Sequence, residues 1–312
     1  MRKISVVIPC YRSQDTIESV VGEVRNTVAI HEQFDYEIVL VNDASPDNVI
    51  EVLFKLAHED PKIKVINLSK NFGQHPAIMS GFNYVTGDLV MCLDDDGQTP
   101  ATEMFKLIEE LDKGFDIVYA NYESKEHNIF RNFGTFVNNV MAELLIDKPK
   151  NVNMTSYFVT KKFIVDEVIK YQNSFPYIGG LLFRVSNKIS KVQVKHRKRL
   201  IGKSGYSFKG LVTLWLNGFT AFSVKPLRIS SLIGFLLAIA GFIYGIIVIY
   251  KRLTNPDIPL GYSSLISAII FIGGMIMLML GLIGEYIGRI YITMNKSPQF
   301  VIRETVNIDE NE

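Results

Sequence analysis

Acidic residues are missing from a long central part of this chain. Residues 168–256 contain no Asp or Glu but hold 14 Lys and Arg, although the formal net charge of all 312 residues is only +1. The acids therefore lie in the first half and towards the end. Such an asymmetry indicates an anionic partner for the central part, either a membrane surface or a ligand that carries phosphate.

Cysteine is also scarce, since the chain has only Cys10 and Cys92. Both lie in apolar runs typical of strands, so we expect two buried thiols that contribute to packing. This excludes a disulfide framework and a cysteine-rich metal site, and it indicates a reducing environment. The first residues enter a predicted strand at once, without the pattern of a signal peptide.

The chain up to residue 160 alternates between predicted strands and predicted helices. Strands are predicted at 4–8, 36–41, 64–68, 88–93, 116–120 and 157–160, and helices at 16–28, 49–58, 76–85 and 103–112. This order favours an α/β fold with a mostly parallel sheet and helices on both faces. Because ligands bind outside the carboxyl ends of such strands, we expect the turns at 9–13, 42–47, 69–74 and 94–98 to share one rim.

Three consecutive carboxylates, Asp94, Asp95 and Asp96, follow one of these strands directly. In an extended segment Asp94 and Asp96 point to one side and Asp95 to the other. Two carboxylates on one side suit a hard divalent cation whose other ligands are phosphates. A solvated acidic turn is the alternative interpretation.

Two stretches near the C-terminus are long enough to cross a membrane. Residues 229–250 and 258–284 carry no charge, and 22 helical residues span about 33 Å. Residues 207–223 before them are rich in aromatic side chains, which is typical of a helix in the headgroup layer. The basic residues on either side of the hairpin predict that both termini face the cytoplasm.

Several motifs resemble family 2 glycosyltransferases with the GT-A fold, and more narrowly the bacterial polyprenyl-phosphate glycosyltransferases related to dolichol-phosphate-mannose synthase. The motifs are Ile4–Tyr11, Val41–Ser45, Ser69–Gly73 and Leu93–Gln98. Arg12-Ser13 replaces the usual Asn-Glu of the family, and Asp95 and Gly97 depart from its Asp-Ala-Asp-Leu-Gln pattern. The order and spacing of the motifs together are specific, and they cover almost the whole chain.

The resemblance implies which residues bind the donor. Asp94, Asp96 and Gln98 are the implied catalytic residues, with Asp94 and Asp96 as ligands of Mg²⁺ or Mn²⁺. The implied nucleotide-sugar site consists of Pro9, Tyr11, Asp43, Asn71, Gly73, Asp94 and Asp95. On local grounds Asp43 could equally be a cap before the helix at 49–58, and both roles are compatible.

The resemblance also implies an acceptor site for a lipid phosphate. Its residues are Arg199, Lys203, Ser204 and Tyr206, from a basic segment that ends in Gly-x-Ser-x-Tyr, and Arg131, which lies where the family has an Arg-containing helix beside the acceptor phosphate. Basic and hydroxyl side chains are suitable partners for a phosphate at the headgroup level. General attraction of a basic segment to the membrane is the alternative, and the two roles coexist easily.

The spans and the resemblance divide the chain into six parts. They are a GT-A domain (1–206), a juxtamembrane amphipathic segment (207–228), a first transmembrane helix (229–250), an extracytoplasmic loop (251–261), a second transmembrane helix (262–284) and a cytoplasmic tail (285–312). Family relatives further imply a homo-oligomer, a tetramer.

The predicted function is an inverting glycosyltransferase of the inner (plasma) membrane with its catalytic domain in the cytoplasm. It moves a hexose from a UDP-sugar to undecaprenyl phosphate, supplying a lipid-linked sugar for cell-envelope glycans. The alternative is a membrane glycosyltransferase that acts directly on a glycan or polysaccharide. A processive synthase lacks support because the Gln-x-x-Arg-Trp motif is missing, and the position of the basic segment beside a membrane span argues against nucleic acid.

Overall fold

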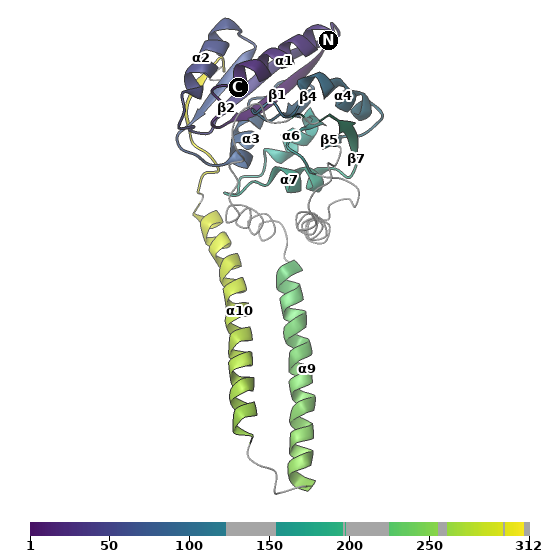
Figure 1. The fold of residues 1–312 in the computed structure, drawn as a ribbon, viewed down its shortest axis with the longest axis vertical. Helices are drawn as coiled ribbons and strands as arrows, with labels where there is room; N and C mark the ends of the chain where they lie inside the picture. The colour runs from purple at the N-terminus through teal and green to yellow at the C-terminus, as the bar shows by residue number, and fades with distance from the viewer. Residues whose placement is uncertain (123–153, 196, 198–224, 255–260, 296, 309–312) are drawn as a thin grey trace.

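The computed structural model describes residues 1–122, 154–195, 197, 225–254, 261–295 and 297–308. These residues form an α/β domain and two long helices that extend from it (Figure 1). The juxtamembrane residues 207–224 and the loop 255–260 lie outside the described residues.

Within the described residues, eight strands form one sheet in the order β7-β5-β6-β4-β1-β2-β3-β8. The strands are β1 (Arg2–Cys10), β2 (Phe34–Asn42), β3 (Ile63–Leu68), β4 (Leu89–Cys92), β5 (Ile117–Tyr122), β6 (Phe158–Lys161), β7 (Ile189–Val194) and β8 (Ile302–Val306). Only β6 and β8 run against the others. The predicted α/β fold with a mostly parallel sheet is confirmed.

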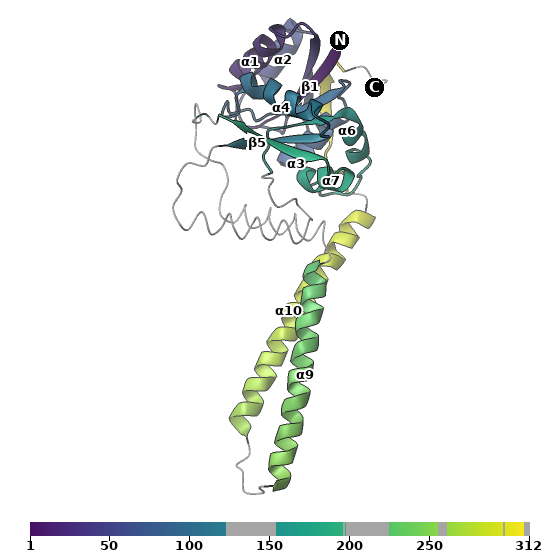
Figure 2. The same ribbon diagram turned by 90° about the vertical axis from the view of Figure 1, so that its right-hand side faces the viewer.

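Helices cover both faces of this sheet (Figure 2). They are α1 (Ile17–Ala29), α2 (Val49–Glu59), the 3-10 turn η1 (Ala101–Glu103) and α4 (Met104–Asp112) on one face, and α3 (Gln74–Phe82), α6 (Lys162–Val168) and α7 (Ile178–Val185) on the other. The second layer faces the side from which the long helices extend. Gly81 lets α3 approach β1, because a Cβ there would lie 2.6 Å from Cγ1 of Val7.

The segment after the long helices returns to the sheet. The predicted division of the chain makes 285–312 a tail, whereas β8 within it pairs antiparallel with β3 at the edge of the sheet. Asn67 donates to Glu304 across this pair at 2.7 Å, and Ile302 packs against the core between the sheet and α3. The sheet is therefore built from two separate parts of the chain.

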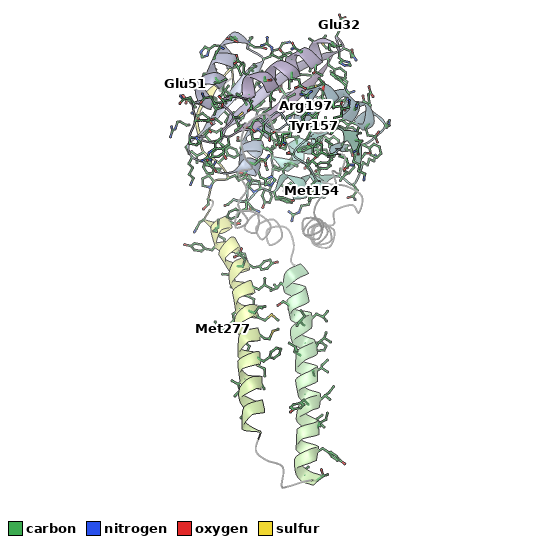
Figure 3. The ribbon with its side chains drawn as sticks, in the orientation of Figure 1. Glu32, Glu51, Met154, Tyr157, Arg197 and Met277 are labelled. Carbon is green, nitrogen blue, oxygen red and sulfur yellow. The ribbon has the colours of Figure 1, made fainter. Side chains whose placement is uncertain are left out.

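The two long helices are α9 (Lys225–Thr254) and α10 (Tyr262–Met294). Each contains a window, Ser230–Ile247 and Phe271–Met294, that is long and apolar enough to cross a membrane. Apolar side chains such as Met277, which is 70% exposed, project from them (Figure 3). Helix α10 continues ten residues beyond the predicted span because Glu285 and Arg289 end the apolar stretch without breaking a helix.

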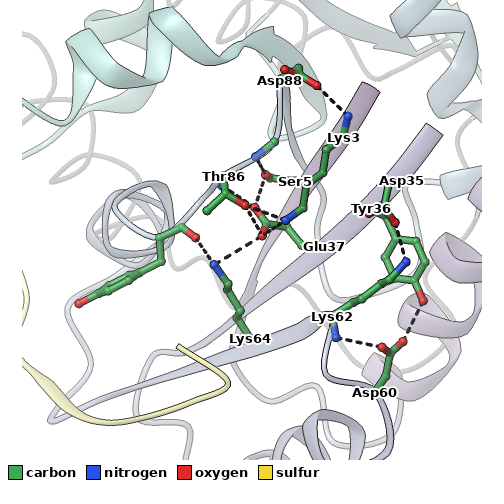
Figure 4. A network of polar contacts seen from close by, with 12 residues as sticks. Lys3, Ser5, Asp35, Tyr36, Glu37, Asp60, Lys62, Lys64, Thr86 and Asp88 are labelled. Atoms are coloured by element: carbon green, nitrogen blue, oxygen red, sulfur yellow. Dashed lines mark hydrogen bonds and ion pairs between the residues drawn. The ribbon is translucent and has the colours of Figure 1, made fainter. Parts of the chain in front are cut away.

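A buried carboxylate, Glu37 of β2, joins three neighbouring strands away from the carboxyl ends (Figure 4). It accepts hydrogen bonds from the hydroxyls of Ser5 and Thr86, and ion pairs with Lys3 at 2.9 Å and Lys64 at 3.5 Å. Burial alone raises the pKa of Glu37, but these donors outweigh it and lower the pKa to about 2.

This network predicts a pH-dependent stability. The folded-state pKa of Glu37 lies below the usual 4.5, so its stabilisation is complete above about pH 4.5 and is lost as the pH falls towards 2. A shift of this size corresponds to roughly 3 kcal/mol. We expect Glu37→Gln to lower the melting temperature at pH 7 and to flatten its dependence on pH below 4.5, in thermal unfolding of the detergent-solubilised protein.

The control is Glu51→Gln, which changes an exposed carboxylate on α2. It should leave the melting temperature within about one degree of the wild type, because exposed charges contribute little. A Glu37→Gln protein as stable as the wild type at pH 7 would contradict the prediction.

Candidate active site

Hydrogen bonds join the turns that follow β1, β2, β3 and β4 into one rim. The backbone N–H of Arg12 donates to Ser45 at 2.7 Å, which connects the first two turns. Asp43 accepts from the third turn, and Gln74 at the end of that turn donates to Asp94 in the fourth at 3.1 Å. The rim therefore brings together chain segments that are up to 80 residues apart.

Asp94 is a partly buried carboxylate at the centre of this rim. Its Oδ1 accepts from the amide of Gln74 and its Oδ2 from the hydroxyl of Ser156. The antiparallel register between β4 and β6, in which Cys92 pairs with Phe158, places Ser156 opposite Asp94. Burial raises the pKa of Asp94 to about 6 against these two bonds, and the charges of Asp96 and Asp95 add to the rise.

Asp95 contacts a different part of the rim. Its Oδ2 accepts the backbone N–H of Tyr11 at 2.8 Å, and its carbonyl accepts the hydroxyl of Thr16 at 2.7 Å. Burial raises its pKa, whereas the Tyr11 bond opposes the rise. Asp95 therefore ties the acidic turn to the turn after β1, and this contact gives a physical role to the Asp that departs from the family pattern.

Asp96 begins a tight turn that ends at Gln98. Oδ1 of Asp96 accepts the backbone N–H of Gln98 at 3.0 Å, and Gly97 between them has a φ of +70°, which a residue without a Cβ adopts readily. Tyr122 of β5 lies near these carboxylates: burial raises its pKa, and the charges of Asp94 and Asp96 raise it further.

Asp43, directly after β2, holds the loop that follows β3. Its two oxygens accept the backbone N–H groups of Phe72 at 2.7 Å and Gly73 at 2.8 Å, and Asn71 donates to its carbonyl at 3.3 Å. Gly73 has a φ of +95°, so a side chain there would be strained. Asp43 therefore organises this loop instead of capping α2, for which the structure shows no side-chain cap among the described residues.

Pro9 and Tyr11 lie at the end of β1. Pro9 pairs with Val41 of β2, and the ring of Tyr11 is 42% exposed, with the guanidinium of Arg12 stacked 5.5 Å from its centre. Arg12 has a φ of +58°, which is uncommon for a residue with a side chain. Its N–H bond to Ser45 holds this conformation.

The donor atoms fit a divalent cation. Asp94 and Asp96 offer carboxylate oxygens, and Gln74 and Ser156, which donate to the Asp94 carboxylate, are neutral. The described residues contain no group of three or more His, Cys, Asp or Glu side chains that could hold a metal. An ion here would therefore need phosphate oxygens and water as further ligands, as Mg²⁺ commonly does.

The predicted acceptor residues Arg131, Arg199, Lys203, Ser204 and Tyr206 lie outside the described residues. The start of their basic segment is described, because Arg197 lies in the α/β domain (Figure 3). Its backbone N–H donates to the carbonyl of Gln98 at 3.1 Å. The basic segment therefore meets the acidic turn.

Sequence reasoning did not identify Gln74, Ser156 or Tyr122 as site residues. Neither the motifs nor the resemblance indicated that Ser156 faces Asp94. Only the register of β6 beside β4 shows this, and β6 is separated from β5 by more than thirty residues of sequence.

An α/β sheet with a carboxylate turn at the end of a central strand is the architecture of GT-A-type transferases, and comparison with known proteins gives the family. Residues 5–169 match Glycosyl transferase family 2, and residues 225–290 match the GtrB C-terminal hairpin. The chain belongs to glycosyl transferase family 2, as the resemblance predicted.

Curated relatives match over nearly the whole chain. An uncharacterized glycosyltransferase, YkcC, of Bacillus subtilis is 30% identical over 98% of this chain and 94% of that protein. The undecaprenyl-phosphate 4-deoxy-4-formamido-L-arabinose transferase of Yersinia pestis is 31% identical over 100% of this chain and 96% of that protein.

Among solved structures, glucosyl-3-phosphoglycerate synthase of Mycobacterium tuberculosis, in complex with Mn²⁺, UDP and phosphoglyceric acid, matches with a TM-score of 0.51. The match covers 69% of this chain and 75% of that chain at 16% identity. This likeness shows the fold.

The bonds of Asp43 predict the effect of removing one acceptor oxygen. Asn has a single acceptor oxygen, so Asp43→Asn leaves the N–H of Phe72 or Gly73 unpaired, at a cost of about 1–3 kcal/mol. We expect faster hydrogen exchange at residues 69–73 and a lower melting temperature. Asp112→Asn, which changes an exposed ion pair with Arg2, is the matched control and should change neither. Unchanged exchange in Asp43→Asn would argue against its role in the loop.

Proposed function

We propose that this protein transfers a sugar from a UDP-sugar to undecaprenyl phosphate. The observation that carries the proposal is the contact between Gln98 and Arg197, because it brings the basic segment that leads to the membrane helices to the acidic turn. Membership of glycosyl transferase family 2 and the similarity to undecaprenyl-phosphate transferases of Yersinia support the same reaction.

The donor site of this proposal is the rim around Asp43 and Asp94. Pro9, Tyr11, Asn71 and Gly73 would line the nucleotide pocket, as the family resemblance implies. Each oxygen of the Asp43 carboxylate already accepts one backbone N–H, and each can accept a second bond, which leaves capacity for a donor from the base.

Mg²⁺ or Mn²⁺ held by Asp94 and Asp96 would neutralise the charge that develops on the leaving diphosphate. Gln98 positions Asp96, because its backbone N–H donates to the Asp96 carboxylate. The bonds from Gln74 and Ser156 fix the orientation of the Asp94 carboxylate.

The acceptor site of the proposal is the basic segment, with Arg131, Arg199, Lys203, Ser204 and Tyr206 around the lipid phosphate. A phosphate oxygen is already ionised at neutral pH, so its attack requires no strong general base. Catalysis would then depend on positioning and charge neutralisation. Attack in line with the leaving diphosphate inverts the anomeric carbon.

The two apolar helices would anchor the protein in the inner membrane with the α/β domain on the cytoplasmic side. Basic residues at Lys225 and Arg228 before the first span support this orientation. A homo-tetramer remains part of the proposal, and light scattering of the detergent-solubilised protein tests it.

The deciding experiment uses purified protein in detergent with undecaprenyl phosphate, Mg²⁺ or Mn²⁺, and a panel of labelled UDP-sugars. The panel contains hexoses and UDP-4-deoxy-4-formamido-L-arabinose, since a relative is named for that sugar. Chloroform-soluble label is expected for one donor. If no donor in the panel yields such label, the proposal fails, and label in a polysaccharide would favour the alternative acceptor.

The carboxylate turn gives a sharper test. Asp96→Asn keeps the size of the side chain but removes its charge, so we expect kcat to fall at least about a hundredfold, with an unchanged melting temperature. Asp15→Asn, an exposed carboxylate near the same rim, is the control and should retain full activity. A fully active Asp96→Asn protein would mean that Asp96 does not hold the metal.

A further inference from the structure

Glu23 lies in the middle of α1, outside every motif of the donor and acceptor sites. Its side chain is only 24% exposed. One oxygen accepts the backbone N–H of Thr102 at 3.2 Å, just after the acidic turn, and the other accepts the guanidinium of Arg197 at 2.7 Å. Glu23 therefore contacts both the chain that leaves the acidic turn and the start of the basic segment.

Arg197 is held at its backbone as well as at its side chain. Its N–H donates to the carbonyl of Gln98 at 3.1 Å, and the side-chain amide of Gln98 lies 3.4 Å from the carbonyl of Arg197. Since Gln98 also donates to Asp96, hydrogen bonds connect Glu23 with Asp96 through two residues.

The guanidinium of Arg197 has an ion-pair partner in Glu23. No acid lies between residues 168 and 256, so a carboxylate partner for the basic segment must come from another part of the chain. Glu23 provides it from 174 positions away. An ion pair in which Arg197 is 45% exposed contributes little to global stability, so its effect should be local.

We propose that Glu23 is a positioning residue for the lipid-phosphate acceptor: by holding Arg197 against Gln98, it keeps the basic segment beside the carboxylates that bind the donor. We call this pair, Glu23 with Arg197, the latch. The inference rests on the proposed function, because it takes the basic segment as the acceptor site.

Covalent geometry explains why one pair can have this effect. Two residues of chain extend at most about 7 Å, so fixing Arg197 restricts the region that residue 199 can reach. Without the latch, the lipid phosphate must itself order this segment, and the cost appears as weaker binding. The same connection through Gln98 predicts coupling between the two ligands, and such coupling is reciprocal.

The first test separates the two substrates. Glu23→Gln keeps an acceptor for Thr102 but removes the charge that holds Arg197. We expect the KM for undecaprenyl phosphate to rise about fivefold or more, while the KM for the UDP-sugar and kcat change less than about twofold. The control is Glu18→Gln on the same helix, which removes a carboxylate in an exposed pair with Lys55 and should behave as the wild type.

The second test concerns the partner. Arg197→Gln should reproduce the effect of Glu23→Gln, whereas Arg197→Lys should retain most of the wild-type affinity because it keeps the charge. Exchange of the two charges in Glu23→Arg/Arg197→Glu should restore part of what either single change loses. Such a recovery would not occur if each residue acted independently.

A binding measurement makes the outcome independent of turnover. The affinity for undecaprenyl phosphate in nanodiscs is measured with and without UDP and Mn²⁺, for the wild type and Glu23→Gln. The proposal requires weaker lipid binding in Glu23→Gln, and a smaller effect of UDP and Mn²⁺ on that binding.

Equal lipid affinity in the two proteins overturns the latch, even if the wild type transfers sugar. Parallel losses in melting temperature and in both KM values also overturn it, because they indicate a purely structural role. A wild type that binds the lipid but transfers no sugar contradicts the proposed function and leaves the latch to be judged by binding alone.

Discussion

The partial burial of Asp94 is the constraint on which the rest of the site depends. A carboxylate largely withdrawn from water needs hydrogen bonds or a countercharge, and the side-chain donors here include the neutral groups of Gln74 and Ser156. They leave its pKa near 6, with Asp95 and Asp96 beside it. Glu37 shows the opposite outcome in the same sheet: burial raises its pKa, but the donors Ser5, Thr86 and Lys3 outweigh burial and lower the pKa to about 2. Groups of the protein thus stabilise the charge of Glu37, whereas the charge of Asp94 at the rim would be stabilised further by a bound cation.

The contrast between Glu37 and Asp94 is related to the uneven distribution of charge along the chain. A lysine beside Asp94 would satisfy the carboxylate and remove its need for a divalent ion and phosphate. The basic residues are instead concentrated in the acid-free part of the chain, and Arg197, where the two regions meet, is paired with Glu23. The acidic turn and the basic segment are therefore separate in the sequence, and a ligand with phosphate groups has the charge to bind the basic residues directly and the carboxylates through a cation.

Local sequence patterns predicted most of the sheet and its helices, because burial on one or both faces imposes a period that can be counted. Val20, Val24 and Val28 of α1 show this, and all three are buried. The contacts between residues of the site were harder to predict from the sequence. The pairing of Ser156 with Asp94 depends on an antiparallel register, and β8 is a five-residue strand whose partner lies more than 200 positions away. No local period encodes such pairings, since they arise only when distant segments share an edge or a rim.

The return of the chain to the sheet connects the two long apolar helices to the rim. Only residues 295–300 separate the end of α10 from Val301, whose carbonyl accepts the N–H of Ser69 at 2.8 Å. Arg303 donates to the carbonyl of the same Ser69, which begins the loop that Asp43 holds. On the other side of the two helices, Arg197 is the last described residue before α9, and its N–H donates to the carbonyl of Gln98. The described residues that precede α9 and follow α10 thus both bind turns of the rim, which is where Asp43 and Asp94 lie.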